Sequence, residues 1–234
     1  MKQLYYSRKG SNSVNNPLYE ATLSNYEWSA YDEIIDNLSV NWYLNDYLTV
    51  KGQFSVTKQY TSSERFYDPL SSKVSVYGTT DTKLQGDLFT GEGSSLSWNS
   101  NAFLYYTRSF GNHNFNFSGG WEASAYNTEN TSAQYRGFPS GQFNSLNYAS
   151  EIYKKPTLTE NTTRRVSILA TLNYTWNDIY LADASVRFDG SSEFGANQKW
   201  APFFSGGLGV NIHNYDFLKG NEKINKLKVR ASYG

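Results

Sequence analysis

The 234-residue chain carries 21 basic and 21 acidic side chains, so its formal net charge is zero, and 17% of its residues are aromatic. The balanced charge gives no reason to expect a nucleic-acid partner, which requires a basic surface. The sequence has no cysteine, which excludes disulfide scaffolds, zinc–thiolate sites and thiol nucleophiles. No apolar run reaches the about 18 residues of a transmembrane helix, although the alternating strands of a membrane β-barrel are not detected by that test.

The N-terminal segment "MKQLYYSRKGSNS" lacks the apolar stretch of a secretory signal peptide. From residue 32 onward, apolar and polar side chains alternate with a period of two, which predicts β-strands. In "TRRVSILATLNYTW", for example, Val166, Ile168 and Leu172 share one face. The expected strands are 32–45, 47–60, 96–110, 113–126, 163–176, 180–189, 200–212 and 224–234. We expect the even-numbered residues of 163–176 and 180–189 to face outward and the odd-numbered ones to face a barrel interior.

The connections between these strands are of two kinds. "LNDY", "FGNHN" and "WNDIY" are minimal hairpin turns, whereas 61–95 and 127–162 are expected to be long loops rich in Gly, Ser, Thr and Asn. Short turns at one end and long loops at the other are typical of outer-membrane barrels. Aromatic residues collect near both ends of the strands, which is the distribution expected if the two ends lie at the two membrane–water interfaces, where aromatic rings are enriched. Those near the short turns are Trp42, Tyr47, Phe110, Trp176 and Tyr180; those near the long loops are Trp98, Tyr126, Phe188, Trp200 and Tyr233.

Charged residues on the polar parity of the strands are candidates for the lumen of the barrel. They would either pair with neighbouring strands or line the interior of the barrel. The lumen-facing candidates are Lys51, Glu122, Asp183, Arg187, Lys228 and Arg230. Arg108 falls instead on the nominally apolar face, which a β-bulge or a snorkelling side chain would explain equally well.

The loop "DGSSEFG" contains two carboxylates, Asp189 and Glu193, but not the residue order of a calcium loop. Turn chemistry, with Gly190 at positive φ, is the simpler interpretation, and a loop-stabilising cation is the alternative. His113 and His213 lie near short turns without a Ser or Asp motif. We therefore expect no enzymatic activity, no cofactor and no metal.

Aromatic residues in the long loops are the remaining candidates for ligand contact, because such rings stack on sugars and pack against peptides. Packing of the loops on one another is the alternative. These residues are Phe66, Tyr67, Tyr77, Phe89, Tyr135, Phe138, Phe143, Tyr148 and Tyr153.

Two stretches, "RFDGSSEFGANQKWAPFFSGGLGVNI" and "FLKGNEKINKLKVRASYG", resemble the SusC/RagA family of TonB-linked outer-membrane proteins of the Bacteroidota. The D-G-S-S-x-F-G motif is matched from Asp189 to Gly195, and L-K-x-R-A-S-Y-G from Leu227 to Gly234. The aromatic hairpin that follows matches only loosely. Pro202 precedes Phe203, and Gly209 or Val210 occupies the position where the family often has a Trp. The resemblance spans most of the chain and is densest over 163–234.

This resemblance implies an all-β fold, the antiparallel up-and-down portion of a transmembrane β-barrel of about 22 strands. It implies an outer-membrane importer of oligosaccharides or peptides that works with a SusD-like lipoprotein and the TonB complex. The signal peptide, TonB box and plug domain of such proteins find no match in residues 1–234. We therefore expect the chain to be a barrel segment that cannot import a nutrient alone.

Two other interpretations remain open at this point. One is a secreted all-β carbohydrate-binding module with aromatic loops. The other is a complete eight-stranded outer-membrane barrel, in which 32–45 and 224–234 would pair with each other. In a segment of a larger barrel, those two strands would instead be the edges of the sheet.

Overall fold

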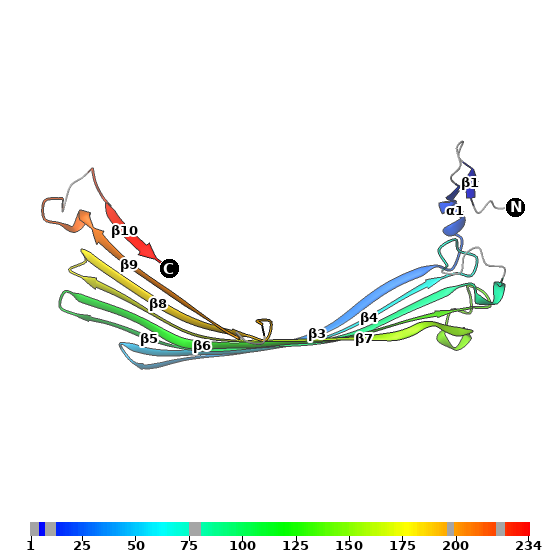
Figure 1. Ribbon diagram of the computed structural model, residues 1–234, viewed down its shortest axis with the longest axis horizontal. Coiled ribbons are helices and arrows are strands. Elements are labelled where there is room, and N and C mark those ends of the chain that lie inside the picture. The colour runs from blue at the N-terminus through cyan, green and yellow to red at the C-terminus, as the bar shows by residue number, and fades with distance from the viewer. Residues whose placement is uncertain (1–4, 8–12, 75–80, 196–198, 219–222) are drawn as a thin grey trace. The chain divides into compact units, whose positions relative to one another are not determined.

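The computed structural model consists almost entirely of β-strands (Figure 1) and describes residues 5–7, 13–74, 81–195, 199–218 and 223–234. A short pair, β1 (Tyr5–Ser7) and β2 (Ser13–Asn15), precedes the helix α1 (Pro17–Glu20). The main strands are β3 (Tyr26–Asn45), β4 (Leu48–Tyr67), β5 (Asp87–Phe110), β6 (His113–Arg136), β7 (Glu151–Trp176), β8 (Tyr180–Ser191), β9 (Trp200–Asn211) and β10 (Lys228–Tyr233). Three single-turn 3-10 helices are η1 (Thr82–Leu84), η2 (Leu146–Tyr148) and η3 (Ile212–Asn214).

The eight main strands form one sheet in chain order, from β3 to β10. Each strand pairs with its neighbour in the sequence, as Figure 1 shows, which confirms the predicted up-and-down arrangement. β3 and β10 lie at opposite ends of this order and are not neighbours. The described strands therefore do not close into an eight-stranded barrel, and the interpretation as a complete small barrel is wrong.

Several strands extend well beyond their predicted ends. β5 and β6 contain 24 residues each and β7 contains 26, more than twice the about 9–11 that cross a bilayer. The prediction that 61–95 and 127–162 are loops was therefore largely wrong, because only 68–86 and 137–150 separate strands. In the extensions polar side chains face one another, as where the hydroxyls of Ser132 and Thr157 lie 2.7 Å apart. Hydrophobicity gives no alternating signal in such segments.

The turn between β7 and β8 is set by Asn177 and Asp178, which have φ values of 55° and 57°. Two successive residues at positive φ define a type I′ turn, whose twist matches that of the paired strands, and Asn and Asp tolerate this conformation best after glycine. The turn places Ile168 opposite Phe188 and Leu172 opposite Ala184. Trp176 pairs with Tyr180, so the three residues 177–179 form the loop that joins the two strands in this register.

The chain divides into two compact units, which we describe separately. Unit 1 consists of Met1–Ile34, Lys58–Ser95 and Thr128–Asn161. Its core is a small cluster of the buried side chains Phe66, Leu88 and Phe138, onto which Tyr26, Tyr135 and Ala149 pack. The rings of Phe66 and Phe138 meet edge to face with 5.2 Å between their centres. Burial of each large side chain contributes about 1.5–3 kcal/mol.

Helix α1 begins with a cap that its sequence encodes. The Asn16 side chain accepts hydrogen bonds from the backbone N–H groups of Leu18 and Tyr19, at 3.0 and 3.4 Å. Pro17 occupies the first turn, where its missing N–H costs nothing. The carboxylate of Glu20, at the other end of the helix, accepts hydrogen bonds from Asn25, from the Ser71 hydroxyl and from both the N–H and the hydroxyl of Ser72.

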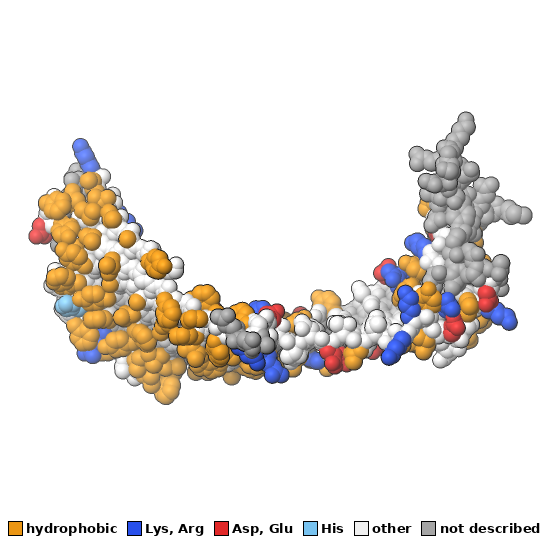
Figure 2. Space-filling view, in the orientation of Figure 1, with side chains coloured by type: hydrophobic (Ala, Val, Ile, Leu, Met, Phe, Trp, Pro, Cys, Tyr) orange, Lys and Arg blue, Asp and Glu red, His pale blue; other side chains and the backbone are white. Residues whose placement is uncertain are grey.

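Unit 2 consists of Ile35–Thr57, Leu96–Asn127 and Thr162–Gly234. Large apolar side chains of β7 and β9 remain exposed; Ile168, Leu172 and Leu208 keep 54%, 41% and 70% of their surface accessible. Figure 2 shows hydrophobic side chains gathered over β8, β9 and β10. A β-sandwich would bury such a face against a second sheet, and no second sheet covers this face among the described residues. This exposure argues against the secreted binding module.

Candidate functional site

The polar face of unit 2 carries a connected group of charged side chains around Arg187 of β8. Arg187 donates from Nε to Asp189 Oδ1 at 2.6 Å, and from Nη2 to Ser167 Oγ at 3.0 Å and to Glu122 Oε2 at 3.4 Å. Ser167 is buried, and it lies opposite Asp189 in the β7–β8 register. The strands β6, β7 and β8 thus each contribute a polar group to one network.

A second ion pair lies further along the same face. Arg230 of β10 donates from Nη2 to both carboxylate oxygens of Asp183, each at 2.8 Å. Asp183 belongs to β8, which is not adjacent to β10 because β9 runs between them. Gly207 of β9 lies opposite Asp183. The guanidinium therefore reaches across a strand position that has no side chain.

The structure brings four of the six lumen-facing candidates into ion pairs on this face, namely Glu122 with Arg187 and Asp183 with Arg230. The Lys51 ammonium lies 5.3 Å from the centre of the Tyr105 ring. Lys228 is two residues from Arg230 on β10 and so points to the same face. Exposure of all six to the lumen of a barrel stays a prediction.

A hollow of about 300 Å³ adjoins the Arg187 network in unit 2. Besides Glu122, Ser167 and Arg187, its walls include polar side chains on three strands, namely Asn99, Ser100, Asn101, Ser124 and Arg165. The hollow combines hydrogen-bond donors and acceptors with charges of both signs. Such a surface suits a polar, hydrated ligand better than an apolar one.

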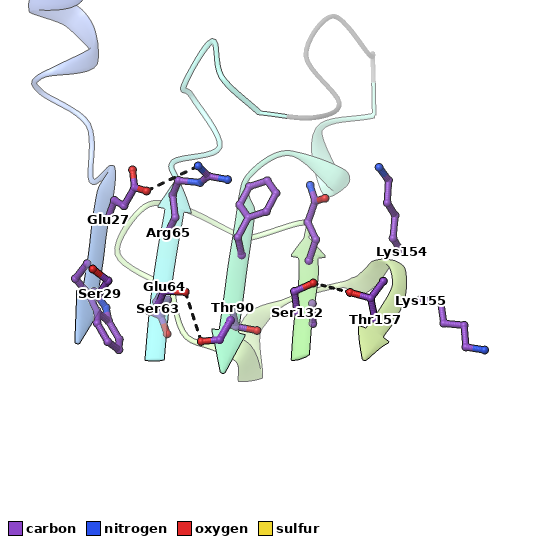
Figure 3. Close-up of a pocket in the computed structure, with 15 residues that line it drawn as sticks. Glu27, Ser29, Ser63, Glu64, Arg65, Thr90, Ser132, Lys154, Lys155 and Thr157 are labelled. Atoms are coloured by element: carbon purple, nitrogen blue, oxygen red, sulfur yellow. Dashed lines mark hydrogen bonds and ion pairs between the residues drawn. The ribbon is translucent and has the colours of Figure 1, made fainter. Parts of the chain in front are cut away.

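Unit 1 has a larger hollow of about 680 Å³ across β3 to β7 (Figure 3). Arg65 lies in its wall, paired with Glu27 at 3.8 Å and with its guanidinium 4.5 Å from the centre of the Phe89 ring. Lys154 and Lys155 of β7 also line the hollow, together with serine and threonine residues of β3 to β7. Sequence reasoning missed this hollow because its residues fall in the extensions of the strands.

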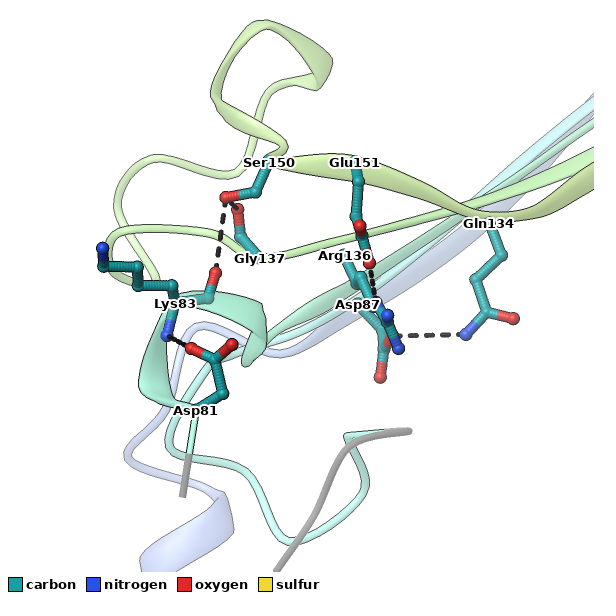
Figure 4. Close-up of polar contacts among 8 residues, drawn as sticks. All are labelled: Asp81, Lys83, Asp87, Gln134, Arg136, Gly137, Ser150 and Glu151. Carbon is teal, nitrogen blue, oxygen red and sulfur yellow. Dashed lines mark hydrogen bonds and ion pairs between the residues drawn. The ribbon is translucent and has the colours of Figure 1, made fainter. Parts of the chain in front are cut away.

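The connections of unit 1 are joined by hydrogen bonds beside this hollow (Figure 4). The Ser150 hydroxyl donates to the carbonyl oxygens of Lys83 and Gly137, at 3.3 and 2.9 Å. Arg136 forms an ion pair with Glu151. These contacts tie the segment before β5 to the β6–β7 connection.

The "DGSSEFG" stretch does not form a shared cation site, because each carboxylate has its own arginine. Asp189 pairs with Arg187, and Glu193 pairs with Arg165 at 2.6 Å. The expectation of positive φ at Gly190 was wrong, since this residue lies within β8 and only Gly86, Gly111 and Gly137 have positive φ among the described glycines. A Cβ at Gly190 would lie 3.0 Å from the Trp200 ring, so glycine here makes room for the indole.

The two histidines have structural partners. His113 accepts or donates a hydrogen bond with the Tyr174 hydroxyl at 2.6 Å and stacks on the Trp176 ring. His213 contacts the carbonyl of Leu227 at 3.0 Å. Among the described residues, no group of three or more His, Asp and Glu side chains is placed to hold a metal ion.

Most loop aromatics pack within unit 1. Phe66, Phe138 and Tyr135 belong to its core, and Phe143 meets Tyr148 edge to face at 4.9 Å. Tyr67 and Phe89 also meet edge to face, Tyr153 lies under the Arg136 guanidinium, and Tyr77 falls outside the described residues. Phe89 is therefore the loop aromatic that the structure places in the wall of a hollow together with a cation.

In the part of the chain that the structure describes, the helices are too short and too polar to cross a bilayer. The long antiparallel strands in chain order, with two chemically distinct faces, are of the kind found in outer-membrane barrels. No protein-family model matches the chain, but comparison with individual proteins gives a consistent answer.

The TonB-dependent receptor P3 of Formosa agariphila is 34% identical over 133 residues, 56% of this chain and 13% of that protein. The TonB-dependent receptor SusC of Bacteroides thetaiotaomicron is 28% identical over 228 residues, 95% of this chain and 21% of SusC. A solved structure of the RagAB peptide transporter shares the fold with a TM-score of 0.82 and 22% identity, covering 98% of this chain and 25% of that one. The chain is thus similar in sequence to TonB-dependent receptors such as SusC and shares the fold of the RagAB structure, and it spans a quarter or less of each of these three proteins.

Proposed function

We propose that the chain forms part of the wall of a TonB-dependent outer-membrane importer that takes up oligosaccharides or peptides. The observation that carries this proposal is the separation of the two faces of unit 2. One face exposes Ile168, Leu172 and Leu208, whereas the other carries the Arg187 and Arg230 ion pairs. A barrel wall between lipid and a watery lumen requires this chemistry.

The polar face would act as a hydrated surface along which a solute moves. Exposed ion pairs such as these contribute only about 0–1 kcal/mol each to stability. Their carboxylates and guanidinium groups can exchange one partner for another at low cost, which suits the passage of a polar solute better than tight binding. A SusD-like lipoprotein and the TonB complex are the partners that the family resemblance implies.

Disruption of the gene in the source organism tests this function. We expect the protein in the outer-membrane fraction, and we expect the disrupted strain to stop growing on at least one oligosaccharide or peptide while it still grows on the corresponding monosaccharide or free amino acids. Complementation with the intact gene should restore growth. Normal growth on every member of a broad panel of such nutrients would contradict the proposed import.

A further inference from the structure

Arg108 of β5 is a cation on the apolar face of unit 2. Its side chain shares a face with Phe110, two residues further along the strand. Phe110 contacts Phe115, and Phe115 contacts Tyr174, with 6.2 and 4.9 Å between ring centres. Tyr174 is two residues from Leu172, whose side chain belongs to the exposed apolar face. Of the two explanations that the sequence left open, the structure thus favours an outward-facing arginine.

Two aromatic rings hold the Arg108 guanidinium. Its central carbon lies 4.5 Å from the centre of the Tyr47 ring and 4.4 Å from the centre of the Phe110 ring. Both rings remain partly exposed, at 43% and 45% of their surface. Stacking of this kind engages the flat faces of a guanidinium and leaves its N–H groups, which point outward in the plane, free to donate.

Arg108 differs from the arginines of the polar face. Among the described residues, neither Arg108 nor Arg164 takes part in an ion pair, whereas Arg165, Arg187 and Arg230 of the polar face each have a carboxylate partner. No hydrogen bond from the Arg108 side chain to another described residue is present either. A guanidinium beside an apolar surface is costly unless an anion or water satisfies it.

The level of Arg108 along the strands is marked by a chain of aromatic contacts, which we call the aromatic band. From one ring to the next, centre-to-centre distances are between 4.9 and 6.3 Å. The aromatic band consists of Phe110, Phe115, Tyr174, His113, Trp176, Tyr180, Tyr215 and Phe217. Aromatic side chains collect where hydrocarbon gives way to lipid headgroups.

We propose that Arg108, held between Tyr47 and Phe110, binds the phosphate of a phospholipid headgroup. This inference rests on the proposed location in an outer membrane. At the depth of an aromatic band the available anions are lipid phosphates, and the fork of guanidinium N–H groups matches two phosphate oxygens. Arg108 thereby fixes the height of the sheet in the bilayer at one point.

The test uses the full-length protein, purified in detergent and mixed with phosphatidylglycerol and phosphatidylcholine, with retained lipids counted by native mass spectrometry. We expect Arg108→Gln to lower the retention of phosphatidylglycerol about fivefold. Arg165→Gln is the matched control, because it removes the same charge from the polar face, where Arg165 pairs with Glu193; it should retain lipid like the wild type. Tyr47→Leu, which keeps the arginine and removes one ring, should give an intermediate loss.

Equal lipid retention by the wild type and Arg108→Gln would overturn the inference, as would displacement of the lipid by excess inorganic phosphate, which indicates a free-anion site. Circular dichroism of each variant establishes that it is folded before its lipids are counted. Membrane fractionation separates this inference from the proposed function. If the protein is in the outer membrane and its Arg108→Gln variant retains all its lipid, only the headgroup site is contradicted. If the protein is absent from the outer membrane, both the headgroup site and the proposed function are contradicted.

Discussion

At the scale of single residues, the connections of unit 1 depend on carboxylates that serve several donors at once. Asp68 is buried; its Oδ2 accepts from the Ser24 N–H at 3.2 Å and its Oδ1 from the Leu70 N–H at 2.9 Å. Gly141 lies so close that a Cβ there would be 1.9 Å from Asp68 Oδ2. Position 141 therefore requires glycine, because any side chain there would push the Asp68 carboxylate away from the N–H groups that it accepts from.

Gly141→Ala should therefore weaken this part of unit 1. We expect a loss of about 1–3 kcal/mol, the usual cost of forcing extra volume into a packed site. Faster amide hydrogen exchange at Ser24 would report it directly. Gly195→Ala is the control, because a Cβ at Gly195 meets nothing within 4 Å. Unchanged exchange at Ser24 in Gly141→Ala would show that the loop can shift without cost.

Glu20 gives the same region a dependence on pH. Burial alone would raise the pKa of its carboxyl, but hydrogen bonds from Ser72, Ser71 and Asn25 outweigh burial and hold the pKa below its ordinary value of 4.5. A lowered pKa in the folded state means that the ionised carboxylate stabilises the fold above pH 4.5. This stabilisation is lost as the pH falls from there through the lowered pKa.

We accordingly expect amide exchange at Ser72, corrected for its intrinsic pH dependence, to lose protection as the pH falls below 4.5. In Glu20→Gln this loss should be absent, and protection should be low at every pH, because a neutral amide accepts these hydrogen bonds more weakly. Glu160→Gln, at an exposed position of β7, should behave like the wild type. A wild-type profile in Glu20→Gln would assign the pH dependence to another group.

Some of these residue-level features have a signal in the sequence. Asn16 followed by Pro17 is a helix start signal, with a capping side chain and a proline in the first turn. The pairing of Glu20 with Ser71 and Ser72 joins positions about fifty residues apart, and no local pattern encodes it. The roles of Arg187 and Arg230 were predicted only as a shared face, because their partners lie on other strands.

At the scale of elements, the β7–β8 hairpin links turn chemistry to register. Asp178 has φ of 57°, which costs an ordinary L-residue about 1–2 kcal/mol. Asp178→Val should therefore destabilise the hairpin by about that amount, whereas Asp178→Gly should be neutral or stabilising. Urea unfolding of the folded protein in lipid measures both. Equal stability of the two variants would show that the turn has another conformation in the bilayer.

The alternation along β8 predicts a difference between neighbouring residues. Ala184 belongs to the apolar parity, whereas the Ser185 hydroxyl lies 2.6 Å from that of Ser205 on the polar face. In outer membranes, Ser185→Cys should react with a water-soluble maleimide and Ala184→Cys should be protected. Ser185→Cys exchanges an oxygen for a sulfur and Ala184→Cys adds one sulfur, so both are small changes and each is the control for the other. Equal labelling of the two cysteines would contradict the assignment of faces.

The central parts of the strands could be predicted because the residues of one face are apolar and most of their neighbours are polar, as in Val166 to Leu172, where Leu169 is the exception. The extensions could not be predicted in the same way. Around Ser132 and Thr157 both faces are polar, so strand pairing is maintained by backbone hydrogen bonds and hydroxyl contacts that leave no hydrophobic period. The predicted loops were therefore too long, because the strands continue into them.

At the scale of the whole molecule, the two outermost strands determine how the chain behaves when it is produced alone. Each of β3 and β10 has one neighbour in the sheet, so a row of N–H and C=O groups on each edge lacks a strand partner within the described sheet. Lipid cannot satisfy these groups, and other strands readily pair with them. Residues 1–234 expressed alone should therefore aggregate or be degraded.

Expression of residues 1–234 behind a signal peptide, followed by size-exclusion chromatography in detergent, tests this expectation. We expect the protein in the detergent-insoluble fraction or as degradation products. A monodisperse monomer in detergent would show that the two edges are protected by some other means. A strain that lacks its own importer and expresses only residues 1–234 should fail to grow on the imported nutrient.

The two-residue period of these strands also has a consequence for how such a sequence can change over generations. Insertion of one codon within β8 would turn every later side chain of that strand to the opposite face, so that Val186 would exchange its surroundings with Arg187. Insertions of two codons would keep the faces and shift only the register. Length variation among descendants of this gene should therefore accumulate in the connections around 68–86 and 137–150, and within the strands it should occur in even steps.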